Sequence, residues 1–239
     1  MKIALIGYGK MGKAIEELAL QDGHEIILKI TSENLSDLNW QNLKLADVAI
    51  EFTNPHSAIA NIKTCIDAGL PVVSGSTGWL EKLEEVTKYC MDNNGSFLYA
   101  SNFSIGVNLF FELNKQLARL MNSRPEYNVT IEEIHHTQKK DAPSGTAITI
   151  AEGIIENITG KEKWILGTSE DSSALNIQSK RIDPAPGTHI VTYDSPVDSI
   201  EIKHTAHNRM GFASGAILAA DFLKDKKGVF GMKDVLNIY

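Results

Sequence analysis

The amino-terminal stretch constrains the fold of this chain more than any other segment. Residues 2–6 form a short apolar run typical of a β-strand, a glycine-rich turn follows, and apolar residues then recur at helical spacing. In such a turn Gly7 permits the tight bend, Gly9 lets the backbone approach a pyrophosphate, and Gly12 lets the helix pack closely on the strand. The order strand, G-x-G-x-x-G, helix predicts a dinucleotide site. Its expected contacts are Gly7, Tyr8, Gly9, Lys10, Met11 and Gly12.

The alternation of strands and helices continues to about residue 104. Further strands are expected at 25–30, 46–52, 71–74 and 96–100, with helices ending near Ile66 and spanning about 80–93. This β-α-β-α period predicts a Rossmann-type domain with a parallel sheet. The loops at the carboxyl ends of its strands should line the ligand crevice. They include Thr53 and the turn Gly75-Ser76-Thr77-Gly78, for which we favour cofactor contact over a merely structural turn.

The residues after the second strand bear on the choice of coenzyme. An NAD site commonly places an acidic residue there to hold the ribose hydroxyls, whereas this chain has Thr31-Ser32-Glu33. Thr31 would not repel the extra phosphate of NADP, but no arginine is present to attract it. The sequence therefore predicts NADH or NADPH as cofactor and leaves the choice open.

The pattern changes after residue 104. A helix is expected over 106–122 and another over 147–158, while 127–134, 174–182, 188–193 and 199–204 read as extended segments. Strands in succession without intervening helices predict a mixed or antiparallel sheet in an α+β domain. The face of that sheet left without helices commonly finds a partner sheet, so a homo-oligomer is expected. A last helix is expected at 212–223.

Composition excludes several functional classes. The net charge of -7 argues against a nucleic-acid or anionic-membrane surface as the main partner. No apolar run approaches the length of a membrane span. The two cysteines, Cys65 and Cys90, show no metal-like spacing, so we expect no metal site and no disulfide framework, and a cytoplasmic location fits best.

The stretch from Glu133 to Ala147 reads E-I-H-H-T-Q-K-K-D-A-P-S-G-T-A. Imidazoles exchange protons near neutral pH, ammonium groups hold or protonate anions, and a Ser144-Gly145-Thr146 turn opening a helix offers backbone N–H donors to a carboxylate. Each residue also has a structural explanation, such as Asp141 capping the helix or Lys140 as a surface charge. The density of proton donors favours a site for an anionic substrate that takes up a proton.

The two histidines allow two arrangements. In an unbroken strand His135 shares the face of Val129 and Ile131, and His136 points the other way. Either one histidine serves the pocket, or the strand ends first and a loop presents both.

The same stretch closely resembles the signature H-H-x-x-K-x-D-A-P-S-G-T-A of dihydrodipicolinate (4-hydroxy-tetrahydrodipicolinate) reductases. Further matches occur in the same order along nearly the whole chain. They are G-Y-G-K-M-G at 7–12, E-F-T at 51–53, G-S-T-G at 75–78, A-S-N-F-S at 100–104 and R-M-G-F-A-S-G-A at 209–216. Departures are Thr31 where many members carry an acidic residue, Ser76 in place of threonine, and a loop at 181–189 that lacks a glycine.

The resemblance implies NAD(P)H-dependent reduction of a small cyclic dicarboxylate in lysine and diaminopimelate biosynthesis. It implies His135 as catalytic proton donor/acceptor, Lys139 as proton donor, and His136 with Gly145 and Thr146 as substrate contacts, beside Ser144 of the same turn. It adds cofactor contacts at Ala100, Ser101, Asn102 and Phe103. It further implies a nucleotide domain of residues 1–104 and 212–239, a substrate and oligomerisation domain of residues 105–211, and a homotetramer. The alternatives are another Rossmann reductase of an amino-acid-derived imine or carbonyl, and a non-catalytic nucleotide sensor.

Overall fold

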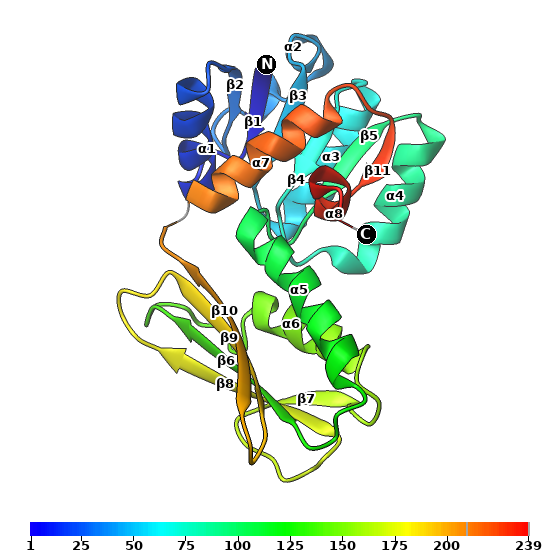
Figure 1. Ribbon diagram of the computed structural model, residues 1–239. Coiled ribbons are helices and arrows are strands. Elements are labelled where there is room, and N and C mark those ends of the chain that lie inside the picture. Colours follow the sequence, from blue (N-terminus) through cyan, green and yellow to red (C-terminus); the bar gives the residue numbers. More distant parts are fainter. Residues whose placement is uncertain (209, 239) are drawn as a thin grey trace. The chain divides into compact units, whose positions relative to one another are not determined.

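The computed structural model describes residues 1–208 and 210–238 (Figure 1). The chain divides into two compact units, one made of Met1–Ile105 with Met210–Tyr239 and the other of Gly106–Arg209. Arg209, which opens the R-M-G-F motif, lies outside the described residues. The assignment of cofactor and substrate roles to separate domains stays a prediction.

The first unit is built on a six-stranded parallel sheet in the order β11-β5-β4-β3-β1-β2. Because β1 pairs with β2 on one side and β3 on the other, the strand order reverses at β1, which is where open parallel sheets bind their ligands. The strands are β1 (Lys2–Ile6), β2 (Glu25–Ile30), β3 (Val48–Glu51), β4 (Val72–Ser74), β5 (Ser96–Tyr99) and β11 (Gly228–Phe230).

Helices cover both faces of this sheet, as Figure 1 shows. On one face α1 (Lys10–Gln21), α7 (Met210–Leu223) and α8 (Met232–Leu236) contribute to a core with alternate sheet residues such as Ile3 and Leu5. On the other face α2 (Trp40–Leu43), α3 (Pro55–Asp67) and α4 (Leu83–Asp92) pack on residues such as Ala4 and Ile6. Two single turns of 3-10 helix, Leu35–Asp37 and Leu80–Lys82, lie in the connections. Strands buried on both faces explain the continuous apolar runs in the sequence.

The second unit holds a five-stranded mixed sheet in the order β10-β9-β6-β8-β7. β6 pairs parallel with β8 and antiparallel with β9, so residues near its carboxyl end meet two strands that come later in the chain. The strands are β6 (Asn128–His135), β7 (Lys163–Leu166), β8 (Ala174–Arg181), β9 (Gly187–Asp194) and β10 (Ser199–Ala206). The expected mixed sheet is confirmed.

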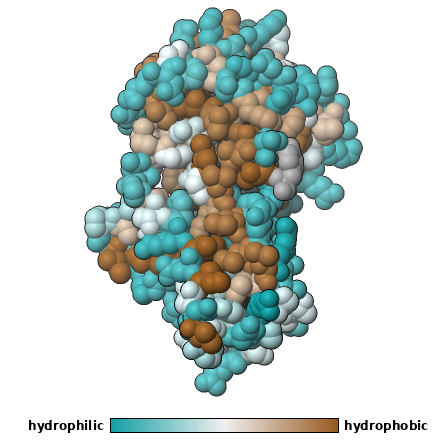
Figure 2. All heavy atoms as spheres, in the orientation of Figure 1, coloured by the Kyte–Doolittle hydropathy of each residue, from teal (hydrophilic) through white to brown (hydrophobic). Residues whose placement is uncertain are grey.

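Helices α5 (Ile105–Met121) and α6 (Gly145–Ile155) supply the apolar side chains that cover one face of this sheet. Their buried residues, such as Phe110 and Ile150, pack with Ile131 of β6 and with β8 and β9. Leu109, Leu113 and Leu120 of α5 are instead exposed. Figure 2 shows apolar surface over this helix.

Several elements differ from the sequence expectations. The short strands β7 and β11 and the helices α2 and α8 were not predicted, because three to five residues are too few to establish a period. The helix expected from Ala147 begins two residues earlier, at Gly145, since Ser144 caps it. Within the described residues, no helix has both the length and the apolar character needed to traverse a bilayer.

Candidate active site

The glycine-rich loop between β1 and α1 has the geometry of a phosphate-binding turn. Gly7 has φ +94°, and a Cβ there would lie 2.0 Å from the carbonyl oxygen of Phe52, so only glycine fits. A Cβ at Gly12 would lie 2.4 Å from the carbonyl oxygen of Gly7, which explains the close approach of helix and strand. A Cβ at Gly9 would meet nothing within 4 Å, and no described side chain caps α1 there. The open backbone N–H groups at this helix start fit a dinucleotide pyrophosphate.

The loops after β3 and β4 are joined by a buried carboxylate that sequence reasoning did not assign. Glu51, at the end of β3, is fully buried and accepts hydrogen bonds from the Ser74 hydroxyl at 2.6 Å and the Ser76 hydroxyl at 2.8 Å. It also accepts bonds from the backbone N–H and the hydroxyl of Thr53. Thr53 and Ser76 are thus brought together, whereas Thr77 is exposed.

Phe52 sets the packing between these loops and the one after β5. A Cβ at Gly75 would lie 2.1 Å from the Phe52 ring, so the β4 loop can approach only because residue 75 is glycine. The Phe52 and Phe103 rings lie 5.7 Å apart, and Ala100, Asn102 and Phe103 are buried. Ser101 is exposed beside them. The expected cofactor contacts from three strands therefore share one edge of the sheet.

Thr31 lies in a tight turn after β2. Its N–H and its hydroxyl both donate to Oδ1 of Asn34, at 2.7 and 3.0 Å, and the hydroxyl accepts from the N–H of Glu33. Close to the glycine-rich loop, Glu16 pairs with Lys29 at 2.5 Å and accepts a hydrogen bond from the Tyr8 hydroxyl. Lys29 is thus already paired with a carboxylate. Residue 31 itself, a threonine, brings neither an acidic nor a basic side chain to the turn after β2.

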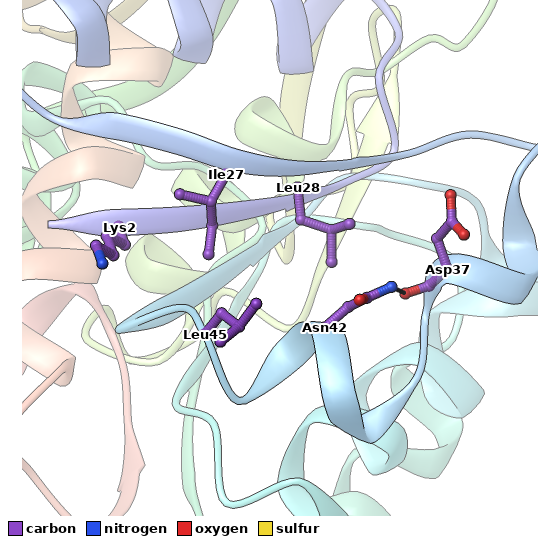
Figure 3. A pocket seen from close by; sticks show the side chains of 6 residues that line it. All are labelled: Lys2, Ile27, Leu28, Asp37, Asn42 and Leu45. Carbon is purple, nitrogen blue, oxygen red and sulfur yellow. Dashed lines mark hydrogen bonds between the residues drawn. The ribbon is translucent and has the colours of Figure 1, made fainter.

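A separate open hollow lies near the amino end of β1 (Figure 3). Its floor is apolar and one rim is polar, where the Asn42 amide donates to the Asp37 carbonyl. It is lined by Lys2, Ile27, Leu28, Asp37, Asn42 and Leu45. None of these is an expected site residue, and ligands of such sheets bind at the opposite ends of the strands.

In the second unit, β6 remains regular through His135. The burial of its residues alternates, and His135 shares the inward face with Val129 and Ile131, as the strand pattern predicts. His136 follows the strand and is half-buried. The ring of His135 lies 5.1 Å from that of His189 on β9. Which histidine faces the substrate stays a prediction.

Glu133 lies on the same inward face and is fully buried. Its Oε2 lies 3.3 Å from Nδ1 of His135, the distance of an ion pair when the imidazole is protonated, although the angles fall outside those of a hydrogen bond. Burial alone would raise the pKa of Glu133, but hydrogen bonds, including those of Ser144 and Ser179, lower it overall. The carboxylate is therefore charged beside the imidazole.

The loop after β6 is held by ion pairs and by Arg181. The Lys139 ammonium donates to both oxygens of Asp141, at 2.9 and 2.7 Å. Burial would raise the pKa of Asp141, but the bond from Lys139 lowers it overall. Arg181 donates to the carbonyl oxygens of Lys139 and Asp141 and to Glu133. Asp141 therefore holds Lys139 and does not cap the helix, and the expected surface position of Lys140 is confirmed.

Ser144 caps α6. Its Oγ accepts a hydrogen bond from the N–H of Ala147 at 3.2 Å and lies 3.2 Å from Nε2 of His189. Burial and the nearby His135 lower the pKa of His189 to about 3, so its ring is neutral at physiological pH. Gly145 is exposed and Thr146 half-exposed at the start of the helix, where backbone N–H groups favour an anion.

Glu133, His135 and His189 also have the spacing of a metal site, with candidate ligand atoms within 4.8 Å of one another. Both oxygens of Glu133 already accept a bond from the N–H of Ser144, and the guanidinium of Arg181 lies 3.2 Å from one of them. This adjacent positive charge opposes a cation. The expectation of no metal stays a prediction.

Four residues that organise these sites were not predicted from the sequence: Glu51, Glu133, Arg181 and His189. The two glutamates carried a readable signal. Each occupies a core position in its strand, and a buried carboxylate requires compensating partners. Arg181 and His189 carried none, because only the register of β6 with β8 and β9 brings them to His135 and Glu133.

A Rossmann-type unit together with a cluster of titratable side chains is the arrangement of a nucleotide-dependent α/β oxidoreductase. The family models for the dihydrodipicolinate reductase N-terminus and C-terminus match residues 1–103 and 106–236. The chain is 48% identical to the 4-hydroxy-tetrahydrodipicolinate reductase of Christiangramia forsetii, over 99% of this chain and 98% of that protein. It is 33% identical to the same enzyme of Methanosarcina acetivorans, over 99% and 89%. The chain belongs to the dihydrodipicolinate reductase family.

Solved structures agree on the fold. The dipicolinate-bound dihydrodipicolinate reductase of Paenisporosarcina sp. TG-14 superposes with a TM-score of 0.78 at 24% identity, with 98% of each chain covered. The amine dehydrogenase of Mycobacterium smegmatis superposes with a TM-score of 0.60 at 11% identity, covering 96% and 94%. The expected α/β architecture, a Rossmann-type unit plus a unit with a mixed sheet, is thereby confirmed.

Proposed function

We propose that this chain reduces 4-hydroxy-tetrahydrodipicolinate to tetrahydrodipicolinate with NADH or NADPH, in lysine and diaminopimelate biosynthesis. The observation that carries this proposal is the 48% identity to a 4-hydroxy-tetrahydrodipicolinate reductase over nearly the full length of both chains. The two chemical sites described above support it, because hydride transfer and proton donation each need one of them.

The first unit supplies the cofactor site. Gly9 and the start of α1 would hold the pyrophosphate, and the loops with Thr53 and Ser76 would line the crevice beside it. The reduced nicotinamide, when bound, supplies a hydride. The residues of the loops after β1, β3, β4 and β5 orient it and exclude water.

The second unit supplies charge and protons for the dicarboxylate substrate. Backbone N–H groups at Gly145 and Thr146 would hold a carboxylate, and His136 would contact the substrate near the same turn. Hydride addition places negative charge on the substrate ring, which a cationic Lys139 or His135 stabilises before one of them donates the proton. Water leaves the substrate overall, so the products are tetrahydrodipicolinate, oxidised nicotinamide and water. Asp141 keeps Lys139 in place.

The oligomeric state and the cellular location are part of the same proposal. We infer a homotetramer through the second unit, whose sheet has one face covered by helices, and a cytoplasmic enzyme without nucleic-acid or membrane partners. The net charge of -7 supports the lack of anionic partners. Size-exclusion chromatography with light scattering measures the oligomer directly, and a monomer at assay concentrations would contradict it.

A coupled assay tests the function. The purified chain is mixed with dihydrodipicolinate synthase, pyruvate and aspartate semialdehyde, and nicotinamide absorbance is followed with NADH and NADPH in parallel. Oxidation that requires both the synthase and this chain is the expected result. Absence of oxidation with both coenzymes would contradict the proposed reaction and favour a nucleotide sensor or a reductase of another imine.

A further inference from the structure

Glu133 places a carboxylate on the inward face of β6, where a charge is costly unless it is paired and hydrogen-bonded. Its strand neighbours on the inward face, Val129 and Ile131, are apolar and fully packed. A buried charge retained at such a place is commonly tied to a specific arrangement of polar groups.

The two oxygens of Glu133 divide their contacts. Oε1 accepts from the hydroxyl of Ser179 at 2.7 Å and from Nη2 of Arg181 at 3.2 Å, both on β8. Oε2 faces Nδ1 of His135 at 3.3 Å and Nε2 of His189 on β9 at 3.8 Å. Both oxygens lie 3.1 Å from the N–H of Ser144. One carboxylate thus contacts β8, β9, the imidazole and the start of α6.

We propose that Glu133 is the positioning residue of the proton-transfer site: it holds the proton of His135 on Nδ1, stabilises the imidazolium, and fixes the Ser144 end of α6 beside it. A carboxylate 3.3 Å from Nδ1 attracts the proton to that nitrogen, so Nε2 is left to exchange a proton with the substrate. This rests on the proposed function, in which His135 transfers protons. It assigns no chemical step to Glu133 itself.

The charges around His135 determine the direction in which removal of this carboxylate changes the stability of the protonated imidazole. Arg181 on β8 is cationic and His189 on β9 is neutral, while the Lys139 ammonium in the following loop is paired with Asp141. Glu133 is the anion that faces the ring. Glu133→Gln removes the attraction and leaves Arg181 and the Lys139–Asp141 pair. The protonated imidazole is then less stable, so activity that needs it is lost at lower pH.

The experiment compares Glu133→Gln with Glu132→Gln, the same change on the next residue of the strand. Glu132 points to the opposite face and pairs with Lys180. We expect kcat of Glu133→Gln to fall roughly 10- to 100-fold. The alkaline limb of its pH–rate profile should move to lower pH, whereas Glu132→Gln keeps the wild-type profile. Glu133→Asp, which retains the charge, should recover part of both losses.

A second measurement needs no turnover. Nitrogen-15 NMR of the histidine side chains reports the tautomer, and the His135 signal, assigned with His135→Asn, should show the proton on Nδ1 in the wild type but not in Glu133→Gln. A folded Glu133→Gln with an unchanged pH profile and unchanged tautomer would overturn the proposal. So would a stoichiometric metal in the purified protein whose removal abolishes activity. If the wild type lacks turnover, the proposed function fails, and the NMR result still decides the role of Glu133.

Discussion

Gly187 on β9 offers a direct test of how tightly His135 is held. A Cβ added at this position would lie 3.1 Å from Nε2 and 3.3 Å from Cδ2 of His135, where ordinary contacts begin at 3.4 Å. The ring is 7% exposed, and its other edge faces Glu133 at 3.3 Å. It therefore has little room to retreat, and Gly187→Ala should displace it by about 0.3 to 0.5 Å.

The expected loss of kcat follows from the displacement of the His135 ring. A misplacement of about 1 Å can cost about 100-fold in rate, so a shift near 0.4 Å should lower kcat roughly five- to tenfold. Overpacking should cost about 1 kcal/mol of unfolding free energy, partly offset because alanine restricts the unfolded chain.

The assay measures kcat in the coupled reaction and unfolding in urea. Gly231→Ala, whose Cβ would come no closer than 3.9 Å to its nearest neighbour, serves as the control for the same substitution and should keep the wild-type kcat. Full activity in a stable Gly187→Ala protein would refute the close packing inferred for His135.

Three further predictions concern the proton donor, the coenzyme and pH. Lys139→Ala should lower kcat about 100-fold or more, while the KM for coenzyme stays within about twofold. Lys140→Ala, which removes the exposed neighbouring ammonium, should behave as wild type, and equal effects of the two would place the acid elsewhere. Thr31→Asp should lower kcat/KM for NADPH about tenfold or more and leave kcat/KM for NADH unchanged, because a carboxylate there repels the extra phosphate. Steady-state kinetics with both coenzymes measures this, and an unchanged ratio of the two kcat/KM values would contradict the prediction. Burial and His135 lower the pKa of His189 from 6.5 to about 3, so the folded protein resists a proton that the unfolded chain accepts. Stability is therefore full above pH 6.5 and is lost progressively as the pH falls from 6.5 toward about 3. Urea unfolding should give a lower free energy of unfolding at about pH 5 than at about pH 7, and His189→Gln should reduce the difference.

The local sequence pattern predicted those features that depend on residues adjacent in the chain. The loop from Gly7 to Gly12 was readable because its glycines, the strand before it and the helix after it are adjacent in sequence. Strand alternation predicted the inward position of His135 only if the strand continued to that residue, and β6 does continue to His135.

The contacts that organise the candidate site could not be predicted from the sequence, because they join strands that lie far apart in the chain. Glu133 meets Ser179 and Arg181 only through the parallel register of β6 and β8, and it meets His189 only through β9. Several pairings of these strands satisfy the same apolar pattern, so sequence periodicity cannot select the register. Likewise, Asp141 does not cap α6: the helix begins at Gly145 with Ser144 as its cap, and the Asp141 carboxylate accepts from the Lys139 ammonium.

The proposed function requires that hydride pass from the nicotinamide to the dicarboxylate substrate on this protein. Coenzyme deuterated at the transferable position of its reduced nicotinamide, supplied with the synthase and its two substrates, tests it by mass spectrometry of the product. The proposed function predicts tetrahydrodipicolinate carrying one deuterium per molecule of coenzyme oxidised. Coenzyme oxidation without deuterium in the product, or no oxidation with either NADH or NADPH, would contradict it.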